Sequence, residues 1–309
     1  MSASNPPRST FPPPPSQRPP AGHPVAFLGA GNMGVPMASS VLKKGFPLQV
    51  WNRTHEKTSA LLDIGAKQKS SPKDCVVGAK VVITMLSDEN ALFDVLCRNE
   101  GVLDGLEPDA VVVDMSTVGR AAALKASEFV KQRNGRFIDA PVSGSIGPAL
   151  SGDLVALVGG KLNDIAKAQP VILAMCKRIL HAGEVGQGQA LKVILNGIGA
   201  HHLAAFVSML ALGERAGIAR RVLVDAFTSG AFASPSYIGK KEKVLSKDYQ
   251  PEFALALALK DSKLNIELQQ EVGLPLPVQR EIHRALEKAV DEGLGEEDLF
   301  ALEKYYKGL

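Results

Sequence analysis

Cysteine is scarce in this chain of 309 residues, which contains three, at Cys75, Cys97 and Cys176. They form neither a C-x-x-C pair nor a Cys/His spacing typical of zinc, so we expect reduced thiols rather than a disulfide framework or a metal centre. Excess charge is also lacking, because 35 basic and 32 acidic side chains leave a net charge of +3. This near balance gives no indication of a nucleic-acid or acidic-membrane partner.

A long uninterrupted apolar run is missing as well. No stretch of 18 or more apolar residues is free of charged and polar side chains, so the sequence predicts no membrane-spanning helix. The length leaves room for about two domains with a sizeable core.

The first 22 residues differ in composition from the rest. Nine of the twenty prolines lie within residues 1–24, among polar residues with almost nothing apolar to bury, which predicts a disordered tail over residues 1–22. The tail has no apolar core typical of a secretory signal, and its proline density disfavours the amphipathic helix of a transit peptide. The absence of acids, with Arg8 and Arg18, leaves a transit role open, as its PxxP content leaves a docking role.

After the tail, apolar strands alternate with helical segments, as a doubly wound parallel sheet requires. After about Gly186 the strand pattern ends and helical segments follow one another. We therefore predict an α/β domain over residues 23–185 and an all-helical domain for substrate binding and oligomerisation over residues 186–309. A long interdomain helix, from near Gln189 to beyond Leu210, joins them. The predicted strands are Val25–Leu28, Leu48–Trp51, Val81–Met85, Ala110–Asp114, Phe137–Asp139 and Leu154–Val158, and a helix is predicted over Ala121–Gln132.

The turn after the first predicted strand carries Gly29-x-Gly31-x-x-Gly34 and leads into a helix. In this context the pattern is a dinucleotide fingerprint. Gly29 permits the tight turn, Gly31 lets a pyrophosphate approach the backbone, and Gly34 allows the helix to pack on the strand. The first domain is therefore predicted to be a Rossmann domain whose cofactor contacts Gly29, Ala30, Gly31, Asn32, Met33 and Gly34.

The second predicted strand is followed by Asn52, Arg53 and Thr54, where an NAD site would carry an acid for the ribose 2′-hydroxyl. No Asp or Glu occurs before Glu56, so no carboxylate of this segment can repel a 2′-phosphate. Arg53 can pair with that phosphate. We therefore predict NADP(H) as the cofactor and assign these three residues to its binding.

A lysine and an amide share one face of the predicted long helix. Lys192, Asn196 and Gly199 fall on a narrow stripe, since residues three and four positions apart stack on a helix. A carbonyl that receives a hydride develops alkoxide charge, which an ammonium group can stabilise and protonate. The stripe is thus a candidate site for carbonyl reduction, although an exposed lysine on an ordinary helix has the same spacing. His201 and His202 point away from the stripe, so we expect no metal there.

Together these features resemble the β-hydroxyacid dehydrogenase family, which includes 3-hydroxyisobutyrate dehydrogenases, and within it the glyoxylate/succinic semialdehyde reductase branch. The resemblance runs from Val25 to near Tyr305. It rests on four motifs in order: the Gly29 to Gly34 fingerprint, Asp139-Ala-Pro-Val-Ser-Gly144 with its continuation to Gly160, Gly186-x-Gly-Gln-Ala-Leu-Lys192-x-x-x-Asn196, and Lys260-Asp261.

The resemblance implies roles for individual residues. Lys192 matches the catalytic lysine and Asn196 the asparagine that orients the substrate, while Ser143 and Gly144 match the loop that anchors a substrate carboxylate. The other matches are Thr117 beside the nicotinamide end of the cofactor and the substrate, Lys260 as a cofactor contact, Leu86 and Ser87 in the loop that passes the adenosine ribose, and Phe253 and Asp261 in the lining of the substrate site.

Two departures from the family pattern bear on the branch and the substrate. The dehydrogenase branch often carries two successive asparagines after the lysine, whereas the first position here is Leu195, which resembles the NADPH-using reductases. Segment 293–299 also resembles that branch. Ser145, Ile146 and Pro148 replace the Gly and Ala common elsewhere in the family, so the resemblance leaves the substrate length open.

We therefore expect a cytoplasmic NADPH-dependent reductase of small carboxylate-bearing aldehydes, such as glyoxylate or succinic semialdehyde, with Lys192 as general acid. By analogy with its relatives we expect a dimer or tetramer, with no nucleic-acid or membrane partner. Three alternatives stay open. The first is a 3-hydroxyacid dehydrogenase working oxidatively. The second is an imine reductase, in which another residue commonly replaces the lysine. The third is a catalytically silent, NADPH-binding or chromatin-associated relative, whose signature would be loss of that lysine.

Overall fold

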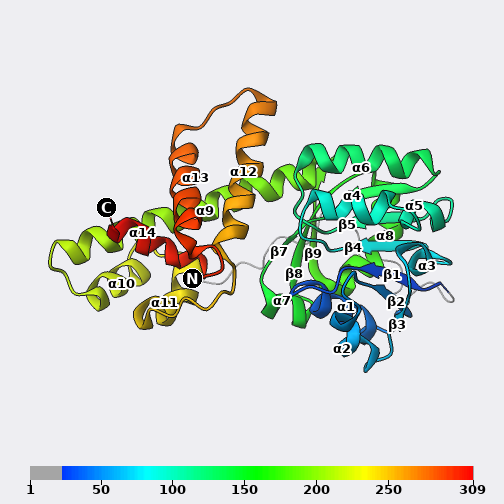
Figure 1. Ribbon diagram of the computed structural model, residues 1–309, viewed down its shortest axis with the longest axis horizontal. Helices are drawn as coiled ribbons and strands as arrows, with labels where there is room; N and C mark the ends of the chain where they lie inside the picture. Colours follow the sequence, from blue (N-terminus) through cyan, green and yellow to red (C-terminus); the bar gives the residue numbers. More distant parts are fainter. Residues whose placement is uncertain (1–22, 309) are drawn as a thin grey trace, which may run out of the picture. The chain divides into compact units, whose positions relative to one another are not determined.

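The computed structural model describes residues 23–308, so the proline-rich tail predicted over residues 1–22 lies outside the described residues. The chain divides into two compact units, an N-terminal unit that ends at Lys192 and a C-terminal unit that begins at Val193 (Figure 1). The first unit is an α/β sheet domain and the second is helical, which confirms the predicted fold class.

One sheet forms the centre of the N-terminal unit. Within residues 23–308 it has nine strands, in the order β3-β2-β1-β4-β5-β6-β8-β7 with β9 beside β8. The strands from β3 to β6 in this order run parallel, and β1 pairs Val25 with Leu48 of β2 and with Val81 of β4. The strands are β1 (Val25–Leu28), β2 (Leu48–Trp51), β3 (Lys67–Gln68), β4 (Val81–Thr84), β5 (Val111–Asp114), β6 (Arg136–Asp139), β7 (Val142–Ser143), β8 (Leu154–Gly159) and β9 (Cys176–Gly183).

Helices cover both faces of this sheet, which explains why every residue of β1, β2, β4 and β5 is buried. Successive side chains enter different cores: Val82 packs with α3 to α6, whereas Ile83 packs with α1, α7 and α8. In Figure 1, α4, α5 and α6 lie on one side of the sheet, and α1 and α7 lie on the other. The helices are α1 (Gly34–Lys43), α2 (Ser59–Leu62), α3 (Pro72–Val76), α4 (Glu89–Cys97), α5 (Val102–Gly105), α6 (Arg120–Gln132), α7 (Ile146–Ser151) and α8 (Leu162–Met175), with a 3-10 turn over His55–Thr58.

The far edge of the sheet differs from the sequence prediction. The strand β8 runs antiparallel to β6 and β7 and parallel to β9, so the sheet is mixed there. The sequence pattern does not predict β3 and β7, which have two residues each, or β9, which has eight. A strand of two residues is too short to show an alternation of apolar and polar side chains. In β9 only Cys176 and Ile179 are buried, so this edge strand has no continuous apolar run.

The C-terminal unit is helical, and no strand forms among its residues 193–308. Its core is built around Phe206, whose ring lies 5.3 Å from that of Phe227, 4.6 Å from Tyr237 and 5.6 Å from Phe300, measured between centroids. The elements are α9 (Gln187–Arg215), which begins in the N-terminal unit, α10 (Arg220–Ser229), α11 (Pro235–Ser246), α12 (Leu255–Val272), α13 (Pro277–Ala289), a π-helical turn (Val290–Leu294), a 3-10 turn (Leu299–Ala301) and α14 (Leu302–Gly308).

The long helix α9 has the length and composition of a membrane-crossing helix, contrary to the sequence expectation. A core helix passes the same test. The buried side chains of Leu203, Phe206 and Leu210 pack in the core of the C-terminal unit, and 39% of the most apolar 18-residue window is buried within the structure. Packing in this core therefore accounts for part of the apolar character of α9.

Candidate functional site

The turn between β1 and α1 has the shape that a dinucleotide pyrophosphate needs. Gly29 has φ +111°, and a Cβ atom there would lie 2.1 Å from the carbonyl oxygen of Met85. A Cβ on Gly34 would lie 2.1 Å from the carbonyl oxygen of Gly29, so neither position admits a side chain. A Cβ on Gly31 would meet no atom within 4 Å. The space over Gly31, at the start of α1, fits a phosphate group.

Asn52, at the end of β2, joins this turn to the following segment. Its Oδ1 accepts a hydrogen bond from the Ala30 N–H at 2.8 Å, and its Nδ2 donates to the carbonyl oxygen of Thr54 at 2.7 Å. The side chain of Asn52 therefore shapes the loop from within. Arg53 and Thr54 are exposed, so the guanidinium of Arg53 is open to an anion from solvent.

A buried carboxylate links the neighbouring strand ends. Asp114, the last residue of β5, accepts hydrogen bonds on Oδ1 from Thr84 Oγ1 at 2.8 Å and from Ser116 Oγ at 2.7 Å. Thr84 is the last residue of β4, so Asp114 ties the loops that follow β4 and β5 together. Because β1, β4 and β5 are parallel, these loops and the glycine turn share one edge of the sheet, where ligands of such sheets bind.

The two linked loops carry three predicted cofactor residues. The Leu86 N–H donates to Ser116 Oγ at 2.9 Å, which fixes the start of the loop after β4. Ser87 is exposed, and its hydroxyl donates to Asp88 Oδ2 at 2.6 Å. Thr117 is half-buried. The structure thus brings the predicted loops to one edge of the N-terminal unit.

The predicted carboxylate-anchoring loop follows β7. Ser143 is half-buried and pairs with Val155 of β8, whereas Gly144 is exposed. Gly144 has φ +134°, and a Cβ there would lie 2.7 Å from a methyl group of Leu154. A hydroxyl and exposed backbone at such a turn are suitable donors for an anion.

The start of α9 is fixed by Asp139, a residue to which sequence reasoning gave no role beyond its motif. The Asp139 carboxylate accepts hydrogen bonds from the N–H groups of Gly186 and Gln189, both at 2.7 Å. Burial raises the pKa of Asp139 to about 6, and the negative charge of Asp114 acts in the same direction. Lys192 follows Gln189 by about one helical turn and is half-buried. The Asp139 carboxylate therefore holds in place the first turn of the helix that carries the candidate catalytic lysine.

The C-terminal unit brings together three residues predicted from the sequence. Asn196 of α9 donates from Nδ2 to Asp261 Oδ2 at 2.7 Å, and Lys260 Nζ lies 3.4 Å from Asp261 Oδ1. Asp261, on α12, is only 7% exposed. A buried carboxylate thus orients the amide of Asn196 from the neighbouring helix.

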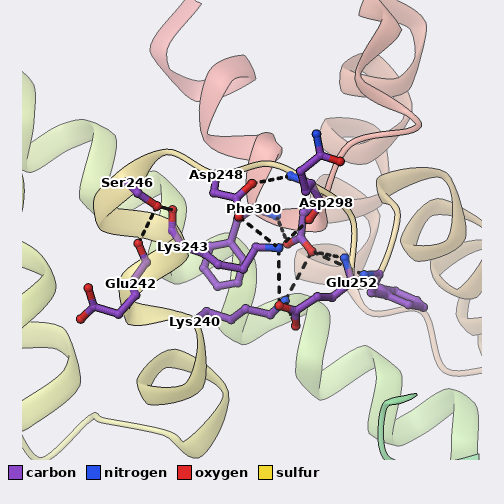
Figure 2. Close-up of polar contacts among 10 residues, drawn as sticks. Lys240, Glu242, Lys243, Ser246, Asp248, Glu252, Asp298 and Phe300 are labelled. Atoms are coloured by element: carbon purple, nitrogen blue, oxygen red, sulfur yellow. Dashed lines mark hydrogen bonds and ion pairs between the residues drawn. The ribbon is translucent and has the colours of Figure 1, made fainter. Parts of the chain in front are cut away.

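The segment that carries Phe253 is held by Asp298, which sequence reasoning did not single out. Asp298 is 1% exposed, and its Oδ2 accepts hydrogen bonds from the N–H groups of Glu252 at 2.9 Å and Phe253 at 3.4 Å. Lys240 Nζ lies 3.4 Å from the same oxygen and 2.5 Å from Glu252 Oε2 (Figure 2). Phe253 itself is 36% exposed, as contact with a ligand requires. The only sequence signal was that Asp298 lies in segment 293–299, which resembles the reductase branch.

The adjacent residues His201 and His202 make hydrogen bonds within the C-terminal unit. His201 Nδ1 lies 2.8 Å from the carbonyl oxygen of Gly197, and the His202 carbonyl accepts from the hydroxyl of Tyr237 at 2.5 Å. Over residues 23–308, no group of three or more His, Cys, Asp or Glu side chains is arranged to hold a metal ion.

Two family models match the chain. Residues 24–183 match the NAD binding domain of 6-phosphogluconate dehydrogenase, and residues 186–306 match the model described as NAD-binding of NADP-dependent 3-hydroxyisobutyrate dehydrogenase. Between them, these ranges contain every candidate site residue described above.

Relatives and solved structures agree with the family models. Glyoxylate/succinic semialdehyde reductases 1 and 2 (chloroplastic) of Arabidopsis thaliana are 35% and 34% identical over 90% of this chain, which corresponds to 96% and 78% of their own lengths. A 3-hydroxyisobutyrate dehydrogenase from Salmonella typhimurium has TM-score 0.84 at 26% identity, over 92% of this chain and 99% of that chain. Psf3 in complex with NADP+ and 2-OPP has TM-score 0.81 at 25% identity, over 91% and 99%.

Proposed function

Since this chain belongs to the β-hydroxyacid dehydrogenase family and is an NAD(P)-dependent oxidoreductase of the hydroxyacid dehydrogenase type, we propose that it is an NADPH-dependent reductase of small aldehyde acids. The observation that carries the proposal is the match, over 90% of the chain, to two proteins named glyoxylate/succinic semialdehyde reductase. The products would be the corresponding small hydroxy acids.

The preference for NADPH is argued from the end of β2. An acid at this place would bind a ribose 2′-hydroxyl and repel a 2′-phosphate, whereas the segment here is Asn52-Arg53-Thr54. The amide of Asn52 is engaged in the loop, so the side chains left facing solvent are those of Arg53 and Thr54, of which Arg53 carries the positive charge. A guanidinium binds a phosphate through charge-assisted hydrogen bonds.

When bound, the nicotinamide cofactor supplies the hydride. Lys192 stabilises the negative charge that develops on the aldehyde oxygen and donates a proton to it, as a general acid. The Ser143 hydroxyl and the backbone at Gly144 hold the substrate carboxylate. Asn196, whose amide is fixed by Asp261, orients the substrate. Together these residues would bind and reduce an aldehyde that also carries a carboxylate.

A second candidate function is a 3-hydroxyacid dehydrogenase that works in the oxidative direction, and the likeness to the Salmonella typhimurium enzyme favours it. The same residues would serve, with Lys192 accepting the proton of the hydroxyl group. Presence of Lys192 disfavours both an imine reductase and a catalytically silent relative.

The testing experiment measures initial rates of NADPH and NADH oxidation with glyoxylate, succinic semialdehyde, tartronate semialdehyde, methylmalonate semialdehyde and a cyclic imine. We expect rapid turnover of NADPH with at least one aldehyde acid, and slower turnover with NADH. Tight NADPH binding without reduction of any aldehyde acid would overturn the proposal, and so would reduction of the imine alone. Oxidation of a 3-hydroxyacid by NAD+ at a higher kcat/KM would favour the second candidate.

A further inference from the structure

Gln189, in the first turn of α9, connects this helix to the loop after β5. Its side chain is fully buried, and its Oε1 accepts hydrogen bonds from the N–H groups of Val118 at 3.2 Å and Gly119 at 3.3 Å. Its Nε2 donates to the carbonyl oxygen of Ser116 at 2.8 Å. One carboxamide therefore bonds to the backbone on both sides of Thr117.

These bonds match what the loop requires. The loop has left the ladder of β5, and Ser116, Val118 and Gly119 are all buried, so their backbone groups need partners within the protein. A carboxamide supplies an acceptor with two lone pairs and a donor from one side chain. A hydrophobic side chain of the same size would fill the space but leave buried N–H and C=O groups without partners, which is costly.

The backbone of Gln189 is fixed as well. Its N–H donates to Asp139 Oδ2 at 2.7 Å, so Gln189 contacts the end of β6 through its backbone and the loop after β5 through its side chain. A Cβ on the neighbouring Gly188 would lie 2.3 Å from the Leu157 carbonyl oxygen, so the helix starts directly against the sheet. Lys192 is three residues further along the same helix, about one turn away. All these residues belong to the N-terminal unit.

We propose that Gln189 is a positioning residue that sets the place of Lys192 relative to Thr117. The inference rests on the proposed function, in which Lys192 donates a proton to the substrate and Thr117 lies beside the nicotinamide end of the cofactor. Gln189 acts through its neighbours, since its side chain is buried behind the loop. A displacement of about 1 Å between reacting groups can cost on the order of a hundredfold in rate, so the fixed distance matters to the chemical step.

Gln49 provides a control for a merely structural role. It is also buried in the N-terminal unit, and its Nε2 donates to the backbone carbonyl oxygens of Cys75 at 3.1 Å and Val77 at 3.0 Å. Gln49→Met removes buried carboxamide bonds to backbone, as Gln189→Met does. Gln49 bonds to neither the loop after β5 nor α9. The two variants therefore share a cost in stability and differ in their relation to Lys192.

The experiment compares wild type, Gln189→Met and Gln49→Met in kcat and KM for the aldehyde acid, in the Kd of NADPH and in Tm. We expect Gln189→Met to lower kcat roughly 10- to 100-fold, with the Kd of NADPH within about threefold of wild type. Gln49→Met is expected to lower Tm comparably while keeping kcat within about threefold. Single-turnover rates with NADPH that carries deuterium at both C4 positions should show a larger isotope effect in Gln189→Met, because the chemical step has slowed.

Equal kcat values for the two methionine variants, with wild type active, would overturn the positioning role alone. A wild-type protein that binds NADPH and reduces no aldehyde acid would overturn the proposed function and this role with it. If Gln189→Met does not fold, Gln189→Glu carries the test, because it keeps an acceptor for Val118 and Gly119 and loses the donor to Ser116. We expect an intermediate loss in kcat from that variant, and an unchanged kcat would contradict the proposal.

Discussion

The amide of Asn196 donates a hydrogen bond to Asp261 Oδ2 at 2.7 Å, from α9 to α12. The other carboxylate oxygen lies 3.4 Å from Lys260 Nζ. Because Asp261 is buried, its charge is held close to these two partners. The hydrogen bond to Asp261 fixes the orientation of the Asn196 carboxamide, because the Nδ2 atom must face α12. The Oδ1 atom and the second hydrogen of Nδ2 are then left to contact a substrate.

We predict that Asn196→Ala and Asp261→Ala each raise KM for the aldehyde acid, and that their effects are not additive. Either change removes the bond that orients Asn196, so the double variant should lose less than the sum of the single losses. The coupling free energy should be about 1–3 kcal/mol in a double-mutant cycle of kcat/KM. Lys263→Ala, at an exposed position of the same helix, is the control and should change nothing. Strict additivity would show that the two residues act separately.

Arg53 should decide the cofactor preference. Arg53→Ala removes the charged donor that we assign to the 2′-phosphate, so the Kd of NADPH should rise roughly 10- to 100-fold while that of NADH changes little. Lys57→Ala removes an exposed positive charge from the following 3-10 turn and is the matched control. Fluorescence titration of wild type and the two variants with NADPH and with NADH gives the six dissociation constants. If Arg53→Ala weakened the binding of NADPH and of NADH equally, the assignment of Arg53 to the 2′-phosphate would be wrong.

Asp139 should make stability depend on pH. Burial raises its pKa from 3.8 to about 6, so the folded state favours the protonated form relative to the unfolded state. The resulting stability is fully present below pH ~4 and is lost as the pH rises through about 6. The free energy of unfolding of wild type, relative to Asp139→Asn, should therefore fall by about 2 kcal/mol between pH 4 and pH 7. Urea unfolding at both pH values measures this difference, and a pH-independent difference would contradict the role of burial.

Asp298 should stabilise the C-terminal unit through the segment that carries Phe253. Asp298→Ala leaves the N–H groups of Glu252 and Phe253 without their acceptor and removes a partner of Lys240 (Figure 2). The free energy of unfolding should fall by about 3 kcal/mol, as when a buried ion pair loses one member. Asp248→Ala removes an exposed carboxylate that lies 3.9 Å from Lys243 and accepts a hydrogen bond from the exposed Gln250 N–H at 3.0 Å, and it should cost less than about 1 kcal/mol. Similar losses in both variants would show that the Phe253 segment does not depend on Asp298.

The sequence predicted the parts of the fold that local pattern determines. Apolar runs such as Val111–Asp114 gave the central strands, and the spacing of Gly29, Gly31 and Gly34 gave the turn. The predicted strand boundaries differ from the structure by one residue at most. The mixed edge of the sheet could not be predicted, because Val142–Ser143 is too short to show a period and Cys176–Gly183 is largely half-buried.

The residues of the candidate site were predicted from motifs, whereas the buried residues that hold these motifs in place were not predicted. Gln189 bonds to residues 70 to 73 positions earlier in the chain, and Asp298 bonds to residues 45 and 46 positions earlier. Hydrogen bonds between residues so far apart in the chain leave no local pattern in the sequence. Asn52 was assigned to cofactor binding, and the structure adds that its amide holds the loop itself. Contacts of this kind arise from tertiary packing, so one sequence alone does not reveal them.

Hydride transfer from NADPH that carries deuterium at both C4 positions to an aldehyde acid tests the central claim most directly. Mass spectrometry of the product, in single turnovers of wild type and Lys192→Ala, reports both the transfer and the role of the lysine. We predict one deuterium on the carbinol carbon of the wild-type product. The rate should be lower by about 10²- to 10⁴-fold in Lys192→Ala, with the Kd of NADPH unchanged. A hydroxy acid without deuterium, or an equal rate in the Lys192→Ala variant, would contradict the account.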